Sequence, residues 1–238
     1  RPDAVDGEIC DILEKYHVTA VELGAQSTND KVLAMNRRGH THEDIFRSAR
    51  LLKERGFELG LQMMTGLYGS NDEDSIGTAR DIISLSPDTA RIYPTVVIEN
   101  TELAELYRNG EYRPQTPEEA AVLCAKILPM FERAGIKVIR LGLHSGGDVE
   151  GSFVAGAYHP ALREMCEGHI YFDIINRALS GKEKGKYIIY VAPREVSKAS
   201  GQRRCNIEKL RELGYECRIK ENAALSARDI TLEKVNLL

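Results

Sequence analysis

The hydrophobic positions of the first 145 residues follow two alternating periods, one typical of helices and one typical of strands. Val5, Ile9 and Ile12 are spaced as on one face of a helix, and Val21 and Leu23 then alternate as in a strand. The same succession continues through this region. It predicts helices at 5–17, 29–38, 42–56, 71–85, 101–110 and 116–135, and strands at 18–24, 57–66, 89–98 and 136–144.

The ends of the predicted helices carry the residues that helix termini prefer. Thr41 precedes one helix and Asp44 stands at its third position, a weak relative of the capping box. Gly56 suits the left-handed residue that ends the same helix. Pro117 stands at a favoured first helical position. These signals support the element boundaries that the periodicity gives.

Strands that alternate with helices favour parallel pairing through right-handed crossovers. A barrel, a partial barrel and a doubly wound sheet all satisfy this pattern. The sequence contains neither GxGxxG nor GxxxxGK[ST], so a dinucleotide fold and a P-loop have no support. We therefore expect an α/β fold, with a (β/α) barrel favoured over a doubly wound sheet.

The pattern changes near residue 145. Residues 145–160 form a Gly-rich stretch that is longer than most connections, and we expect two short helices at 160–168 and 169–181. After a charged linker, the sequence predicts a strand, a helix and two further strands. We therefore divide the chain into a barrel region at 1–145, a Gly-rich loop with helices at 146–180, and a small α+β tail at 181–238.

Composition narrows the class of protein. The chain has 238 residues, a net charge of −4 and a pI near 5.9, which argues against wholesale attraction to nucleic acid or membrane and leaves room for local basic patches. No run approaches the roughly 18 apolar residues of a membrane span, and no signal-peptide pattern is visible. We expect a cytoplasmic location. The odd count of five cysteines, at spacings unlike those of metal motifs, predicts reduced structural thiols and no metal ligand in this chain.

Polar side chains follow the predicted strands at their carboxyl ends, where parallel α/β proteins bind ligands. No obvious nucleophile–base pair is among them, but together they suit a polar ligand with a ribose, an amino group and a carboxylate. Arg37, Arg38, Gly39 and His40 stand between two predicted helices. The residues at the strand ends are Glu22, Gln26, Ser27, Gln62, Gly66, Arg91, Tyr93, Thr95, Arg140 and His144.

Each of these residues also has a structural explanation. Glu22 at a strand end is equally well explained as a solvated residue or a partner of a helix dipole. Met63 and Met64 are better explained as core filling than as a cofactor contact. The "NRRGHT" stretch is typical of a solvated turn with a cap. In the tail, "GQRRCN" can contact phosphate, although a charged surface turn is the commoner explanation.

The order of the motifs carries more information than any one of them. "RPD", "VELGAQS", "NRRGHT", "LLKERGFELGLQMMTGLYG" and "PDTARIYPTVVIENTELAELYRNGEY" resemble successive motifs of the radical S-adenosylmethionine (SAM) superfamily. The most similar branch contains the Elongator catalytic subunit and its short bacterial relatives, and oxygen-independent coproporphyrinogen oxidase is a more distant cousin. The resemblance covers roughly residues 1–145.

This resemblance implies a partial (β/α) barrel and a set of cofactor contacts. Glu22, Gln26 and Ser27 match the ribose-contacting motif, and Arg38 stands where the family has an Arg for the methionine carboxylate or the ribose. A further set is implied near the ribose and the adenine, with two substrate candidates beyond it. The adenosine set is Gln62, Gly66, Ile92 and Tyr93, and the substrate candidates are Arg140 and His144.

The resemblance also implies a [4Fe–4S] cluster, whose CxxxCxxC-type motif is absent from this sequence. "RPD" matches the end of the family's third strand, so we expect the cluster ligands and two earlier strands to lie outside these residues. The open edge that this leaves favours self-association. Tyr68 stands where the family usually has Pro, with an expected structural effect only.

Two functions follow from the sequence. The first is the carboxyl-terminal portion of an enzyme, an oxidoreductase or transferase, that reductively cleaves SAM to a 5′-deoxyadenosyl radical, in tRNA modification or a related pathway. The tail is too short for an acetyltransferase domain. The alternative is a cluster-less module that binds a nucleotide or RNA without catalysis. The substrate, a small molecule or tRNA, stays open, and no membrane partner is expected.

Overall fold

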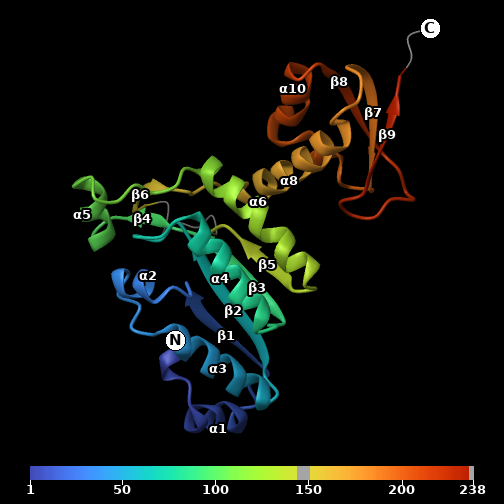
Figure 1. Cartoon of the computed structure of the whole chain (residues 1–238). Helices are drawn as coiled ribbons and strands as arrows, with labels where there is room; N and C mark the ends of the chain where they lie inside the picture. Colours follow the sequence, from blue (N-terminus) through green and yellow to red (C-terminus); the bar gives the residue numbers. More distant parts are fainter. Residues whose placement is uncertain (144–150, 236–238) are drawn as a thin grey trace. The chain divides into compact units, whose positions relative to one another are not determined.

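The computed structural model describes residues 1–143 and 151–235, which form two compact units, Arg1–Pro160 and Ala161–Leu238 (Figure 1). Unit 1 contains a four-stranded parallel sheet with the strand order β1-β2-β3-β5. Its strands are β1 (Ala20–Gln26), β2 (Glu58–Thr65), β3 (Thr89–Pro94) and β5 (Lys137–Leu141). The helical segments of this unit are η1 (Pro2–Ala4), α1 (Gly7–Lys15), α2 (Asp30–Met35), α3 (His42–Glu54), α4 (Asp72–Ser84), α5 (Glu102–Arg108) and α6 (Pro117–Arg133).

One face of the parallel sheet is apolar and covered by helices. Successive side chains of a strand point to opposite faces, so every second residue of a strand lies on the same side. Helices α3, α4 and α6 contact strands β1, β2 and β5, and they lie along the sheet in Figure 1. The side chains of the strands that this arrangement buries completely or nearly so include Leu23, Ala25, Leu59, Leu61, Met63, Ala90, Ile92 and Val138. The expected partial barrel of parallel strands is confirmed, and Met63 is core as predicted.

The strand predicted at 89–98 is two strands. Pro94 ends β3, and the next residue, Thr95, donates both its backbone N–H and its hydroxyl to the carbonyl of Thr65, at 2.9 and 2.8 Å. The chain then enters β4 (Val96–Ile98), which pairs antiparallel with β6 (Phe153–Gly156). The single-strand prediction is wrong because the apolar run continues through a change of sheet. Strand β6 lies in the stretch predicted to be a loop.

Unit 2 contains a second sheet, with the order β8-β7-β9. Strands β7 (Gly185–Val191) and β8 (Tyr215–Glu221) are parallel, and β9 (Ile230–Lys234) pairs antiparallel with β7. The strand, helix and two strands predicted for the tail are confirmed, and two short segments are added between β7 and the helix. The helical segments of the unit are α8 (Leu162–Leu179), α9 (Val196–Ser200), η2 (Gln202–Arg204) and α10 (Cys205–Glu212).

Helix α8 is continuous, whereas the sequence predicts two helices that meet at Gly168. A Cβ atom at Gly168 would lie 3.4 Å from the Cα of Gly201, and the Gly168 carbonyl accepts a hydrogen bond from Asn206 Nδ2. Gly168 therefore lies inside α8 where the backbone of the helix approaches the backbone of Gly201. Tyr171 and Ile175 of the same helix are fully buried in the core with the β7 side chains. The second unit accordingly begins at Ala161, although the sequence suggests a tail that begins at 181.

A buried carboxylate joins α8 to the loop before β9. Glu167 is 5% exposed, and its Oε2 lies 2.6 Å from Arg228 Nη1, while its Oε1 lies 3.7 Å from Arg163 Nε. A buried charge is tolerated when it is paired in this way.

Within residues 1–143 and 151–235, no helix has the length and the apolar content that a membrane crossing needs.

The capping box predicted for α3 is present and offers a test of the helix boundary. The Asp44 N–H donates to Thr41 Oγ1 at 3.2 Å, and the Thr41 N–H donates to Asp44 Oδ2 at 3.0 Å. We expect Thr41→Ala to lower the free energy of unfolding by about 1 kcal/mol, because one donor of the first turn loses its acceptor. Urea unfolding followed by circular dichroism measures this change. Thr19→Ala, at an exposed position that caps no helix, is the matched control and should leave the midpoint unchanged.

Candidate functional site

The face of the sheet opposite the helices is polar. Glu22, Gln62, Arg91 and Tyr93 occupy the alternate positions that do not enter the core, and each is partly or fully exposed. The strand register brings them together, because Glu22 pairs with Gly60, and Gln62 pairs with Arg91. The sequence places such side chains at strand ends, and the sheet gathers them onto one surface, which we call the polar face.

An ion pair crosses β2 on the polar face. Arg91 Nε lies 2.8 Å from Glu22 Oε1, and both side chains are 35% exposed. Gly60 of the intervening strand makes this possible, because a Cβ atom there would lie 3.2 Å from Glu22 Cγ. Arg91 Nη1 also donates to the Tyr93 hydroxyl at 3.3 Å, and this hydrogen bond is the main cause that raises the pKa of Arg91, with Glu22 adding to it. The pair fixes the position of the Glu22 carboxylate.

Gln26 ends β1 in an unusual backbone conformation. Its φ is +65°, and the register with β2 shifts between Gly24 and Gln26, so one extra residue is inserted in β1. A left-handed residue other than glycine carries strain of roughly 1–3 kcal/mol, and such strain collects at binding sites. The Gln26 side chain is 5% exposed, and its Oε1 accepts a long hydrogen bond of 3.5 Å from Gln62 Nε2. The bulge thus turns the carboxamide back over the polar face.

The guanidinium of Arg38 lies near Gln26, and its buried Nε has no hydrogen-bond partner in the described part of the chain. A Cβ atom at Gly24 would lie 2.5 Å from Gln26 Nε2 and 3.7 Å from Arg38 Nη2, so the glycine leaves space for both side chains. Burial lowers the pKa of Arg38, and the nearby Arg1 lowers it further. Its Nε is buried with no hydrogen-bond partner, and no carboxylate of residues 1–143 or 151–235 pairs with it. A desolvated guanidinium in this state is suited to an anionic ligand.

His40 is a second polar group beside the end of β1. It is 5% exposed, and its Nε2 lies 3.0 Å from the carbonyl oxygen of Ala25. If Nε2 donates to that carbonyl, Nδ1 is an acceptor, and Nδ1 is buried without a partner in the described part of the chain. The sequence places His40 in a loop but gives no reason to select it. The feature that distinguishes His40 is its burial, which is visible only in the folded structure.

Of the remaining predicted residues, Ser27 and Ile92 do not join the polar face. Ser27 is buried against α4, where its hydroxyl lies 3.5 Å from that of Thr78, so it does not join the polar face. The Ile92 side chain is in the core, and its carbonyl accepts a hydrogen bond from the Gly142 N–H. Arg140 pairs with Arg91 in the strand register. His144 lies outside the described residues.

Gly66 belongs to a separate cavity of about 600 Å³ at the carboxyl end of β2. Its carbonyl accepts a hydrogen bond from the Tyr112 hydroxyl at 2.6 Å, and burial raises the pKa of Tyr112 to about 12. Gln115 Oε1 accepts from the Thr65 hydroxyl at 3.2 Å. The turn that follows β2 therefore borders a cavity that is open to solvent, as a glycine turn beside a ligand would.

The described residues do not fit an iron–sulfur cluster. Four of the five cysteines are buried and Cys205 is half-buried, and none of the five forms a disulfide bond in the described part of the chain. Burial raises the pKa of Cys124 to about 12 and that of Cys217 to about 11, whereas a cluster binds thiolates. Within residues 1–143 and 151–235, no three His, Cys, Asp or Glu side chains are grouped as metal ligands.

Comparison with known proteins supports this picture of the fold. Residues 1–82 match the radical SAM superfamily, and residues 87–171 match the radical SAM C-terminal domain. The tRNA uridine(34) acetyltransferase of Methanocaldococcus jannaschii is 35% identical over 139 residues, which are 56% of this chain and 26% of that protein. Human Elongator complex protein 3 is 33% identical over 140 residues, or 55% of this chain and 24% of that protein.

A solved structure agrees with the sequence comparisons. The Elp3 protein of Methanocaldococcus infernus, without its residues 1–46, superposes with a TM-score of 0.61 at 27% identity, covering 73% of this chain and 45% of that one. The chain belongs to the radical SAM superfamily. Within it, more than half of the chain is homologous to the radical SAM region of the Elongator protein 3 branch, as the motif order predicts. The chain spans about a quarter of the length of these curated relatives.

The burial of the cysteine thiols can be tested by chemical labelling. A raised pKa keeps the Cys124 and Cys217 thiols protonated at pH 8, and their burial excludes a reagent. We expect a thiol reagent such as Ellman's reagent to modify one cysteine rapidly in the folded protein, Cys205, and the other four only on unfolding. Cys205→Ser should remove the fast phase. Rapid labelling of several thiols in that variant would contradict the burial described above.

Proposed function

We propose that the polar face binds SAM, and that the chain serves as the SAM-binding part of a radical SAM enzyme. The observation that carries this proposal is Arg38, whose buried Nε has no partner and whose guanidinium lies near Gln26 beside Gly24. Gln26 in turn contacts Gln62, and the polar face also carries Glu22, which Arg91 holds in place. SAM presents a carboxylate, an ammonium and ribose hydroxyls, which are the groups that this set complements. Membership of the superfamily supports the choice of this ligand.

Each side chain has a distinct role in this proposal. Arg38 binds the methionine carboxylate through its guanidinium. Gln26 and Gln62, whose present hydrogen bond is long, use their amide groups on the ribose hydroxyls. Glu22 accepts from the ribose or from the ammonium, and Arg91 holds it in place. Tyr93 and the turn at Gly66 lie toward the adenine.

The described residues of this chain do not fit the [4Fe–4S] cluster of the family. In members of the family, a [4Fe–4S] cluster supplies the electron that cleaves SAM. The thiols described here are buried and scattered, so we assign this chain's residues no part in holding the cluster. Their contribution is to bind the cofactor and orient its nucleoside and amino-acid ends.

The process that we propose for the enzyme is tRNA modification. The support for it is the similarity to proteins named tRNA uridine(34) acetyltransferase from two Methanocaldococcus species, at 35% and 37% identity. The substrate would meet the polar face beside the cofactor. Arg140 of β5, whose register partner is Arg91, is the described residue that we propose for contact with it.

A titration of SAM into the chain by isothermal calorimetry tests the binding site. We expect weak binding, and Arg38→Gln should weaken it by roughly 10- to 150-fold, since hydrogen bonds to charged groups contribute about 1.5–3 kcal/mol. Because Arg38 has no protein partner in the described region, its replacement should leave the unfolding midpoint intact. S-Adenosylhomocysteine, which keeps the carboxylate and the ribose, should bind with the same dependence on Arg38.

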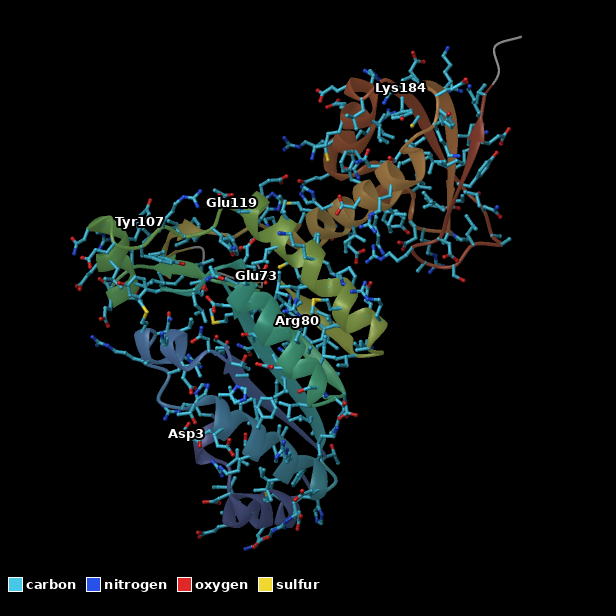
Figure 2. The ribbon with its side chains drawn as sticks, viewed as in Figure 1. Asp3, Glu73, Arg80, Tyr107, Glu119 and Lys184 are labelled. Carbon is cyan, nitrogen blue, oxygen red and sulfur yellow. The ribbon has the colours of Figure 1, made fainter. Side chains whose placement is uncertain are left out.

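Arg80→Gln is the matched control for this substitution. Arg80 is exposed on α4, which also carries Glu73, and this helix covers the opposite face of the sheet (Figure 2). It removes the same charge without touching the polar face, so the affinity for SAM should not change. Failure of the wild-type chain to bind SAM, or equal binding by wild type and Arg38→Gln, would overturn the proposal.

A second candidate function is a binding module without radical chemistry. It is favoured by one observation, the absence of grouped thiols from the described residues. In this case the polar face would hold a nucleotide that lacks the methionine group. Adenosine would then compete with SAM in the titration at equal affinity, whereas the first proposal predicts that SAM binds more tightly through its carboxylate.

A further inference from the structure

The two units differ in the sign of their net charge. Residues 161–238 contain 15 Lys and Arg against 11 Asp and Glu, a net charge of +4, whereas residues 1–160 contain 17 against 25, a net charge of −8. The overall charge of −4 therefore conceals a basic unit. A local excess of positive charge attracts polyanions even in an acidic protein.

The positive charge of unit 2 is concentrated around strand β8. Two neighbouring cavities, of about 500 and 430 Å³, share Arg204, Ile207, Cys217, Arg218 and Lys220. We call the surface formed by the two cavities the β8 groove. Strand β8 is at the edge of its sheet, and the neighbouring strand β7 also contributes residues to the groove. Its basic residues are Lys186, Arg204, Arg211, Arg218 and Lys220.

Most of these cations are unpaired. Glu216 is the acid that lines the groove, and it lies 3.7 Å from Lys186. The side chains of Arg204, Arg211 and Arg218 are exposed and form no ion pair or hydrogen bond with residues 1–143 or 151–235. Elsewhere in the same unit, by contrast, Lys198 pairs with Glu195 at 2.7 Å. The groove therefore presents several free positive charges with little internal compensation.

The turn that carries Arg204 is held rigidly. Arg203 and Arg204 both have left-handed backbones, with φ of +51° and +64°. Asn206, which is 1% exposed, anchors the turn by donating to the carbonyls of Gly168 and Ala199 at 2.8 and 3.1 Å. Buried hydrogen bonds to two helices keep this strained pair in place. These hydrogen bonds hold the backbone of Arg204 next to the residues that the two cavities share.

We propose that the β8 groove binds the phosphodiester backbone of a nucleic-acid strand. A surface with several free guanidinium groups over two adjoining cavities suits a chain of phosphates, because Arg binds phosphate oxygens bidentately. The aromatic residue that lines the groove, Tyr187, is 4% exposed and donates its hydroxyl to the Glu183 carbonyl. It offers no ring for stacking a base, so the groove contacts the backbone without reading sequence. The motif "GQRRCN" is thus part of a binding surface.

The choice of RNA over DNA rests on the function proposed above. The proposal that the groove binds a phosphodiester backbone does not depend on that function. RNA bound at the β8 groove would account for substrate capture by a surface outside the polar face. The match to the radical SAM C-terminal domain ends at residue 171. The elements that line the groove, including β7, β8 and α10, lie beyond that residue. The groove lies within the carboxyl-terminal unit, Ala161–Leu238.

Fluorescence anisotropy with a labelled single-stranded RNA 20-mer tests the groove. The variant Arg211→Gln/Arg218→Gln removes two charges, one from α10 and one from β8, without altering the strained turn. We expect at least about tenfold weaker binding and a log–log salt dependence that is shallower by about 1.4, since each phosphate contact to a single strand contributes about 0.7. Circular dichroism should show that the variant is folded.

Arg177→Gln/Lys182→Gln is the matched control, because it removes two exposed charges of unit 2 that do not line the groove. It should bind RNA as the wild type does. An RNA of unrelated sequence should bind equally, and a DNA strand of the same sequence should bind no more tightly than RNA. No binding of RNA, equal binding by the groove variant, or tighter binding of a poly-glutamate peptide would overturn the proposal.

The two proposals fail in distinguishable ways. Arg211→Gln/Arg218→Gln should leave the calorimetric affinity for SAM unchanged, because the substitutions lie outside the polar face. Arg38→Gln should leave the anisotropy with RNA unchanged for the same reason. Loss of SAM binding in the groove variant would contradict the separation of the two sites. RNA binding without SAM binding would support the groove and overturn the proposed function.

Discussion

The constraint on which unit 1 depends is that helices cover one face of a parallel sheet and leave the other open. Hydrogen bonding between neighbouring strands fixes their register, and alternation then sends every second side chain to each face. The helix-covered face can accept only apolar groups at low cost. Polar residues of the same strands must therefore share the opposite face, where Glu22, Gln62 and Arg91 meet. Binding chemistry and core packing are two results of one pairing pattern.

The elements of this sheet could be predicted from the sequence because local patterns determine them. Helix α3 is capped by Thr41 and is followed by Gly56, as the capping signals indicate, and β2 falls inside its predicted range. The polar residues at strand ends were identifiable for the same reason, since a strand's carboxyl end is a local property. The motif order added the family, which the comparisons show independently.

Features that depend on tertiary contacts could not be predicted. The contact of Glu22 with Arg91 spans an intervening strand and needs a glycine at residue 60, and the burial of His40 follows only from the folded end of β1. The break at Pro94 is hidden because apolar residues continue across it into another sheet. Likewise, the cations of the β8 groove come from separate elements of unit 2, and only the fold brings them together around β8.

The continuity of α8 has a consequence for how such a protein is assembled from genetic parts. The match to the radical SAM C-terminal domain ends at residue 171, in the middle of this helix. A gene joint placed there would separate Tyr171 from Ile175 and Leu179, which are all fully buried in one core. A joint between Pro160 and Ala161 would leave both cores whole. Recombination that exchanged the second unit among relatives would therefore have to carry the entire helix, including the half that resembles the family.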